Sequence, residues 1–443
     1  MQDLPKGSKK LINAWAFYDW ANSVYTLVIA SSIFPIYYGA LFKLKGSLYI
    51  DAFGSNFKST ALISFVTAAA FLLVAFLSPI LSGIADYAGN KKLFLKFFCY
   101  LGAFSCIGLY WFSLADIYVG LTFYFLALIG FWGSLVFYNS YLPDIAFPEQ
   151  QDAASAKGYS IGYIGSVLLL IINLTMVMTA ESNEAALSAM KLSFIMVGIW
   201  WIIFSQYTFY YLPKGQKKSG ERNKVSLIFG GFKELKKVWN SLSDNLILKK
   251  YLISFFVYSM AVQTVMLVAT YFGEQEIAWK DDSQKTTGLI ISILVIQLVA
   301  VAGAQVTSIL SSKIGNIRTL ILINIIWVVI CIAAYFVATP MHFYITAGFV
   351  GLVMGGIQSL SRSTYSKLLP ETQDTASYFS FYDVAEKIGI VIGMCIYGVI
   401  DQITGSSRLA IMFLALFFGV GVLMLNHLRI YSKKKPISFY SPN

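Results

Sequence analysis

Charged side chains are scarce in this sequence. Asp, Glu, Lys and Arg make up 12% of its 443 residues, about half of their share in an ordinary soluble domain. This composition argues against a soluble protein. Only His342 and His427 represent histidine, and they are too far apart in the sequence to suggest a metal site. All four cysteines fall in apolar stretches and are predicted to be small buried residues, with no disulfide framework: Cys99, Cys106, Cys331 and Cys395.

The sequence is rich in long apolar stretches. Hydrophobic residues make up 57% of the chain, and stretches long enough to cross a bilayer recur along its whole length. The first stretch follows basic residues, but it contains Asp19 and lacks a small-residue cleavage site, which indicates a membrane helix and not a signal peptide. We predict an all-α membrane protein with about twelve transmembrane helices, at residues 12–41, 60–84, 93–113, 117–139, 157–179, 190–212, 248–272, 286–311, 317–338, 341–366, 376–400 and 407–430.

The net charge of +11 is explained by membrane topology. The basic residues lie in short loops between apolar stretches and form no continuous face, so nucleic acid is not the predicted partner. With the N-terminus inside the cell, most of the 33 Lys and Arg residues fall on the cytoplasmic side. We therefore expect an integral multi-pass protein with both termini in the cytoplasm.

The longest polar stretch divides the chain into halves. We predict a six-helix bundle at 1–212, a cytoplasmic basic linker at 213–247, a second six-helix bundle at 248–430 and a cytoplasmic tail at 431–443. The linker segment from Leu227 to Trp239 is compatible with an amphipathic helix on the anionic inner leaflet, or with a solvated basic segment.

Two short motifs recur in the two halves at nearly the same offset. Gly89–Lys92 corresponds to Gly315–Arg318, and Tyr141–Asp144 corresponds to Leu368–Glu371. Two six-helix pseudo-repeats of this parallel kind are typical of the major facilitator fold, whose bundles rock around a site near the middle of the membrane. The sequence thus predicts a secondary transporter.

Five charged residues are predicted to lie inside the spans, toward their cytoplasmic ends. Charges at this depth are costly unless they face a partner or a cavity, so Asp19, Arg362, Asp383, Glu386 and Lys387 are candidates for a substrate, coupling or gate site. The last three share one helix face, where Lys387 can neutralise Asp383. We hypothesise that the remaining acid and Asp19 pair with Arg362 and latch the cytoplasmic side closed. The alternative is that these charges lie at the interface and fix helix depth.

Asp86 belongs to a short inner loop that also contains Gly89 and Lys91. Its carboxylate is predicted to meet the N-terminal end of a neighbouring helix, where the helix dipole favours negative charge, and to act on conformation. Three polar residues on the spans are candidates for lining a cavity, although each alone is better explained as a helix–helix hydrogen bond: Tyr18, Asn22 and Gln358.

Several motifs together resemble those of one family. They are Tyr18–Ser23, Gly158–Gly165, Gly355–Ser363 and Phe379–Asp383, and they resemble the signatures of the vacuole-effluxer-like family of the major facilitator superfamily, also called the unknown major facilitator family. The resemblance covers nearly the whole chain. It implies a transporter similar to fungal autophagy-related proteins that release neutral amino acids from the vacuole, and to their bacterial relatives.

Our leading expectation is a carrier for a small molecule, with amino acids first by resemblance and protons as the candidate coupling ion. A lipid or amphipathic-drug exporter of the same fold is the second reading, since 28 Tyr and 35 Phe are enough to line an apolar cavity. A polytopic membrane enzyme or a nontransporting receptor is disfavoured, because the sequence has no Cys/His or Ser/His/Asp constellation and no large sensor domain. We expect no cofactor, a monomer in contact with membrane lipids, and a bacterial inner membrane as its location.

Overall fold

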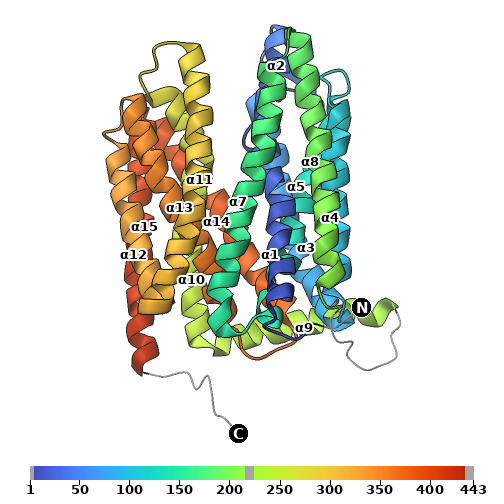
Figure 1. The fold of residues 1–443 in the computed structure, drawn as a ribbon, viewed down its shortest axis with the longest axis vertical. Coiled ribbons are helices and arrows are strands. Elements are labelled where there is room, and N and C mark those ends of the chain that lie inside the picture. Colours follow the sequence, from blue (N-terminus) through green and yellow to red (C-terminus); the bar gives the residue numbers. More distant parts are fainter. Residues whose placement is uncertain (1–3, 215–223, 435–443) are drawn as a thin grey trace. The chain divides into compact units, whose positions relative to one another are not determined.

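The computed structural model describes residues 4–214 and 224–434, and long α-helices account for most of them (Figure 1). This part of the chain confirms the predicted all-α fold class. Its elements are, in chain order, α1 (Lys9–Val24), a π-helical stretch (Tyr25–Ala30), α2 (Ile33–Lys45), β1 (Tyr49–Ala52), β2 (Ser55–Lys58), α3 (Ser59–Ala88), α4 (Lys91–Gly108), a 3-10 turn (Leu109–Trp111), α5 (Ile117–Asn139), α6 (Leu142–Ile145), α7 (Pro148–Met178), α8 (Asn183–Tyr211), α9 (Lys224–Asp244), α10 (Leu246–Glu276), α11 (Asp282–Ile314), α12 (Asn316–Ala334), α13 (Pro340–Leu368), α14 (Thr375–Thr404) and α15 (Ser407–Lys434).

Within the described residues, eleven helical stretches are long and apolar enough to cross a membrane. α14 adds a further helix of spanning length, with 30 residues, and it carries the charged group at Asp383, Glu386 and Lys387. The prediction of about twelve spans is confirmed by this count. The chain is a multi-pass membrane protein.

Two local features were not predicted. The first span is interrupted by the π-helical stretch, within which the hydroxyl of Thr26 donates to the carbonyl of Ser23 at 2.8 Å. Such a hydrogen bond competes with regular helical bonding. After α2, strands β1 and β2 form an antiparallel hairpin. Its tight turn places Phe53 and Gly54 at φ values of 50° and 73°, the positive values that two-residue hairpin turns require.

The prediction that all four cysteines are buried is wrong for Cys395. All four are free thiols, but only Cys99, Cys106 and Cys331 are buried, whereas Cys395 is exposed on α14. An apolar stretch contains both lipid-facing and packed positions, and its sequence does not distinguish them when both are apolar.

The segment predicted as a linker contains a helix, α9 (Figure 1). Val238 and Leu242 on α9 are buried, whereas Phe232 and Trp239 are exposed, and the Trp239 ring lies 5.6 Å from the ring of Phe381. This segment is therefore helical, and its contact with the inner leaflet stays a prediction. Residues 215–223 of the predicted linker and 435–443 of the predicted tail lie outside the described residues.

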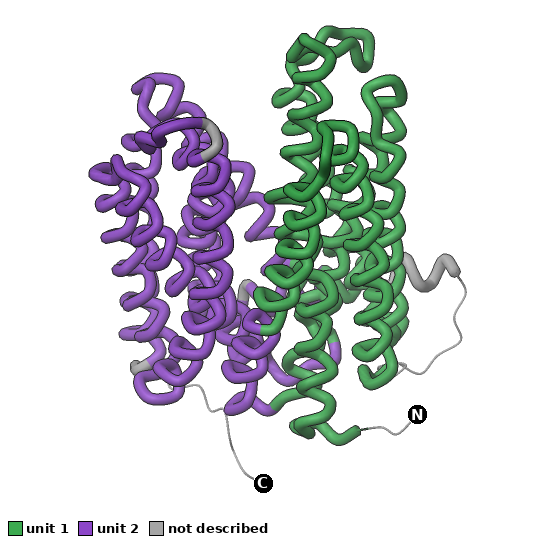
Figure 2. The backbone as a smooth tube through the Cα atoms, turned by 45° about the horizontal axis from the view of Figure 1, so that its top comes forward, with its two compact units in different colours: residues 1–146, 161–235, 374–380 green, residues 147–160, 236–373, 381–443 purple. Residues whose placement is uncertain are grey.

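The chain forms two compact units, coloured separately in Figure 2. Unit 1 comprises residues 1–146, 161–235 and 374–380, and unit 2 comprises residues 147–160, 236–373 and 381–443. Three helices therefore change unit along their length, and α9 does so after residue 235. The first part of α7 belongs to unit 2 and its remainder to unit 1, while the first turns of α14 belong to unit 1 and the rest to unit 2.

Glycines set the closest helix contacts in each unit. In unit 2, α11 and α13 lie so close that a side chain at Gly303 would meet the backbone of Leu352, and one at Gly355 would meet the backbone of Ala300. In unit 1, α7 approaches α1 at Gly162, where an added carbon would lie 3.1 Å from the carbonyl of Asp19. Small residues at these positions let the helix backbones approach closely.

Candidate functional site

A buried cluster of charges lies on α14, about two turns inside the helix. The side chains of Asp383, Glu386 and Lys387 share one face, as their spacing predicts, and are called the α14 triad below. The Lys387 ammonium lies 2.5 Å from the Asp383 carboxylate and 3.0 Å from that of Glu386. The side chains are 1% (Lys387), 6% (Asp383) and 18% (Glu386) exposed. The predicted pairing of Lys387 with Asp383 is confirmed, and the ions are largely withdrawn from solvent.

An amide from α10 also contacts this cluster. The Gln263 side chain donates from Nε2 to Oε1 of Glu386 at 2.7 Å. α10 reaches α14 closely because Gly393 has no side chain, and an added carbon there would lie 2.9 Å from the Met260 side chain. Gln263 was not singled out from the sequence, since a lone glutamine on a span has no distinguishing pattern.

Aromatic and hydroxyl groups lie beside the triad. The ring of Tyr382, on α14, stacks on Phe255 of α10 with 4.0 Å between centroids and lies 5.0 Å from Tyr365 of α13. The Tyr258 hydroxyl is 2.7 Å from the Ser361 hydroxyl, and Tyr251 donates to the Ser361 carbonyl at 2.9 Å. Unit 2 thus brings fixed charges, amphipathic rings and hydroxyls close together.

Gln358 and Arg362 lie on α13, and Arg362 joins α13 to the start of α7. Gln358 lies with its amide nitrogen 3.6 Å from the sulfur of Met266. Arg362 is 2% exposed and donates to the hydroxyl of Ser155 at 2.9 Å and to its carbonyl at 3.0 Å. Its guanidinium also lies 4.3 Å from the ring centroid of Tyr159, a cation–π contact. The predicted pairing of Arg362 with Asp19 stays a prediction.

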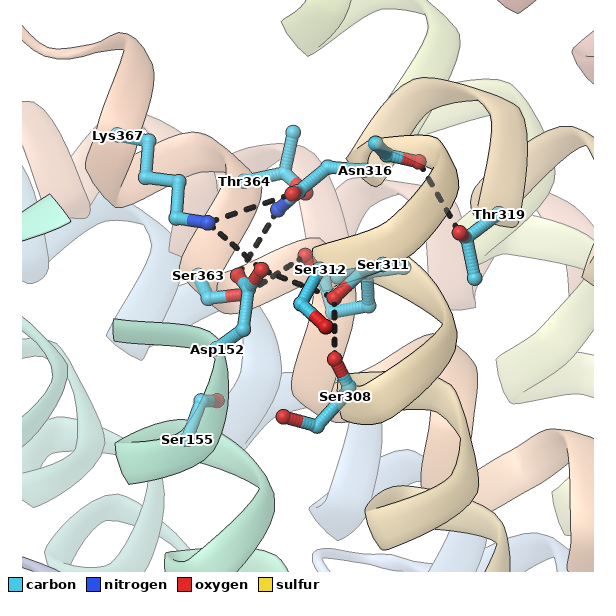
Figure 3. Close-up of polar contacts among 12 residues, drawn as sticks. Asp152, Ser155, Ser308, Ser311, Ser312, Asn316, Thr319, Ser363, Thr364 and Lys367 are labelled. Atoms are coloured by element: carbon cyan, nitrogen blue, oxygen red, sulfur yellow. Dashed lines mark hydrogen bonds and ion pairs between the residues drawn. The ribbon is translucent and has the colours of Figure 1, made fainter. Parts of the chain in front are cut away.

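Asp152, one turn before Ser155, is the centre of a second polar cluster (Figure 3). Its carboxylate accepts from Lys367 Nζ at 2.6 Å, from the Ser311 hydroxyl at 2.9 Å and from the Asn316 amide at 2.9 Å. These three partners come from α13, α11 and α12, so one carboxylate holds the first part of α7 to three helices. Asp152, Ser311, Asn316 and Lys367 are called the Asp152 cluster below.

In unit 1, Asp86 meets the N-terminus of α14. Its carboxylate accepts from the backbone amides of Ser377 at 2.7 Å and Ala376 at 3.2 Å. α3 ends just beyond Asp86 at Gly89, whose φ of 62° is unfavourable for other residues. Lys91 donates to the Thr375 hydroxyl at 2.8 Å and pairs with Asp144. The predicted contact of Asp86 with a helix N-terminus is confirmed, and its role in conformation stays a prediction.

The remaining candidates lie inside unit 1. Asp19 is 5% exposed and accepts a hydrogen bond from the Tyr138 hydroxyl at 2.8 Å. Tyr18 is fully buried, with its ring 4.9 Å from that of Tyr138, and Asn22 is 1% exposed. Tyr18 therefore packs in the core of its unit, and a cavity-lining role for Tyr18 and Asn22 stays a prediction.

Comparison with known sequences shows the family to which this chain belongs. A sequence model of the family described as "Vacuole effluxer Atg22 like" matches residues 7–436. The chain belongs to this Atg22-like family. The uncharacterized MFS-type transporter YxiO of Bacillus subtilis (strain 168) is 30% identical over 416 residues, which cover 93% of each chain. Autophagy-related protein 22 of Kluyveromyces lactis is 22% identical over 495 residues, covering 98% of this chain and 96% of the relative.

Solved structures share the fold of this Atg22-like chain. The proton:xylose symporter XylE, a major facilitator superfamily (MFS) protein, aligns with a TM-score of 0.72 at 12% identity, covering 94% of this chain and 95% of XylE. The Escherichia coli fucose:proton symporter FucP aligns with a TM-score of 0.66 at 16% identity, covering 95% and 97%. The predicted major facilitator fold is confirmed, and the chain is a member of a transporter family with that fold.

The Asp152 cluster is the main part of the site that sequence reasoning missed in this Atg22-like chain. Asp152 and Lys367 lie at predicted span ends, where charges are ordinary. One signal was available, because Asn316 belongs to the repeated motif Gly315–Arg318. Among residues 4–214 and 224–434, no three His, Cys, Asp or Glu side chains are grouped as metal ligands.

Proposed function

We propose that this protein is a secondary transporter of small solutes, most strongly neutral amino acids, that works by alternating access and is coupled to protons. The observation that carries the proposal is the α14 triad, an ion cluster buried in a membrane helix of a transporter family. Ionisable groups at such depth are costly and are retained where they bind a substrate or an ion. We assign contact with an amphipathic solute to the adjoining rings and hydroxyls, which are buried in this structure.

Two of the helices that change unit, α7 and α14, supply the contacts that we expect to move. In alternating access two bundles, which we assign to residues 1–212 and 248–430, move relative to each other. α7 changes unit after residue 160 and α14 after residue 380, so such motion requires each helix to release contacts near its changeover or to bend. We assign this gating role to the Asp152 cluster, to Arg362 with Ser155, and to Asp86 with the start of α14.

We place the protein in a bacterial inner membrane as a monomer, with both termini in the cytoplasm. The bacterial relative supports the first assignment and the concentration of Lys and Arg in the loops of one side supports the orientation. With this orientation the Asp152 cluster and Asp86 lie toward the cytoplasm. The neutral amino acids come from the resemblance to fungal vacuolar effluxers.

The test is transport of a labelled panel of neutral amino acids in proteoliposomes, with and without an imposed pH gradient. We expect saturable transport of at least one member, and accumulation that follows the gradient at about tenfold per pH unit for one coupled proton. Empty liposomes are the control. Folded protein that moved none of the panel in either direction would contradict the amino-acid assignment.

A further inference from the structure

Two basic side chains are in direct contact where the start of α10 meets the end of α15 in unit 2. The Lys250 ammonium, on α10, lies 2.9 Å from Nε2 of His427, on α15. It also lies 3.8 Å from the ring centroid of Tyr431, one helical turn after His427. Lys250, His427 and Tyr431 are called the basic cluster below. An ammonium has three donor hydrogens, so hydrogens remain on Lys250 for the oxygen atoms of an anion.

No acid offsets the basic cluster in the part of the chain that the structure describes. Within residues 4–214 and 224–434, neither Lys250 nor His427 forms an ion pair. Asp244, the acid nearest to Lys250 in the sequence, is exposed and pairs with neither of them. Lys250 is only partly buried and His427 is exposed. The cluster therefore attracts anions and is accessible to them.

An exposed apolar stripe on α15 leads to the basic cluster. Three exposed residues share the face of α15 that carries His427, because they precede it at helical spacing: Leu416, Val420 and Leu423. On α10, Ile253 is exposed one turn after Lys250. The two helices pack together along this length, since a side chain added at Gly421 would lie 2.9 Å from that of Tyr258. Each helix thus combines a basic side chain with an exposed apolar face.

We propose that the basic cluster and the apolar stripe together bind an anionic phospholipid of the inner leaflet. The proposal rests on the orientation assigned above, which places the start of α10 and the end of α15 at the cytoplasmic leaflet, where anionic lipids create a negative surface potential. The headgroup phosphate accepts hydrogen bonds from Lys250 and from the Tyr431 hydroxyl, and an acyl chain follows Leu423 and Ile253. A soluble phosphate would use the basic cluster alone, whereas a lipid uses both features.

Native mass spectrometry of the full-length protein in detergent tests this proposal without any transported solute. The probes are phosphatidylglycerol, which is anionic, and phosphatidylcholine with the same acyl chains, which has no net charge. Wild-type protein should retain phosphatidylglycerol more strongly. K250M should lower its affinity for phosphatidylglycerol by about fivefold, which corresponds to about 1 kcal/mol for one basic residue at an anionic leaflet. K250R keeps the charge and should keep the preference.

The matched control is K96M. Lys96 also lies over an aromatic ring, 5.4 Å from the centroid of Phe209, but it belongs to α4 of unit 1. Its replacement removes one positive charge without touching the basic cluster, so the affinity for phosphatidylglycerol should be unchanged. Equal retention of the two lipids by the wild type, or a loss in K96M as large as the loss in K250M, would overturn the proposal.

A second arm distinguishes a phospholipid from a soluble phosphate. An excess of glycerol phosphate should not displace phosphatidylglycerol, because it has no acyl chain to contact the apolar stripe. L423Q should weaken retention of phosphatidylglycerol, whereas I309Q, a matched change at an exposed position of α11, should not. Displacement by glycerol phosphate together with full retention by L423Q would overturn the lipid assignment in favour of a soluble anion.

Discussion

Replacing Lys387 with methionine is expected to lower the free energy of unfolding by about 3–5 kcal/mol, the cost of removing one partner from a buried ion cluster. Lys387 is 1% exposed and is the ammonium partner of both Asp383 and Glu386. Its loss leaves two carboxylates close together with no cation of the triad to offset them. Transport should fall with the fraction of folded protein.

The measurement is thermal unfolding of purified protein in detergent. The matched control is K249M, which removes an exposed lysine near the start of α10 and should leave the melting temperature nearly unchanged. K387R keeps the charge, and K387M combined with D383N removes one charge of each sign, so both should be more stable than K387M. A melting temperature of K387M equal to that of K249M would show that the triad contributes nothing to stability.

Replacing Asp152 with alanine is expected to loosen the first part of α7 from α11, α12 and α13. The variant loses the ion pair with Lys367 and the hydrogen bonds from Ser311 and Asn316. A hydrogen bond to a charged group contributes about 1.5–3 kcal/mol, and about 1.4 kcal/mol is a factor of ten in an equilibrium. The state in which the first part of α7 is released from α11, α12 and α13 should therefore be populated at least about tenfold more in D152A than in the wild type.

A thiol placed at Ser363 reports this opening, because Ser363 lies on α13 near the Asp152 cluster and is fully buried (Figure 3). The background carries C395S, which removes the exposed natural thiol. Labelling of S363C by a water-soluble thiol reagent should be at least about tenfold faster with D152A. E149Q changes an exposed acid in the first turn of α7 and should leave the rate unchanged. Equal labelling rates of S363C in D152A and E149Q would contradict the gating role proposed for Asp152.

Contacts between near neighbours in the sequence could be predicted for this chain. The pairing of Lys387 with Asp383 follows from helical spacing, and the spans follow from apolar length. The contact of Asp86 with a helix N-terminus was predicted from its place in a short inner loop and from the helix dipole, although the sequence did not say which helix it would meet. These predictions need little knowledge of how distant helices pack.

Contacts between distant helices could not be predicted in the same way. Asp152 meets Lys367 across 215 positions of sequence, and Gln263 meets Glu386 across 123. Which polar side chains meet depends on the rotation and depth of each helix, and both are set by packing around residues such as Gly303 and Gly355. The exposed Cys395 was missed for the same reason, since lipid-facing and buried positions are both apolar.

The central claim is that this protein is an alternating-access carrier, and counterflow tests it most directly. Proteoliposomes are loaded with an unlabelled neutral amino acid from the panel and diluted into a trace of the same compound in labelled form, with no pH gradient. The account predicts that the label transiently accumulates inside above its outside concentration and then declines. The reason is that the carrier returns to the outside loaded with the unlabelled compound, which is in excess inside. A rise of the label to equal concentration with no overshoot, for every amino acid that the protein moves, would contradict it.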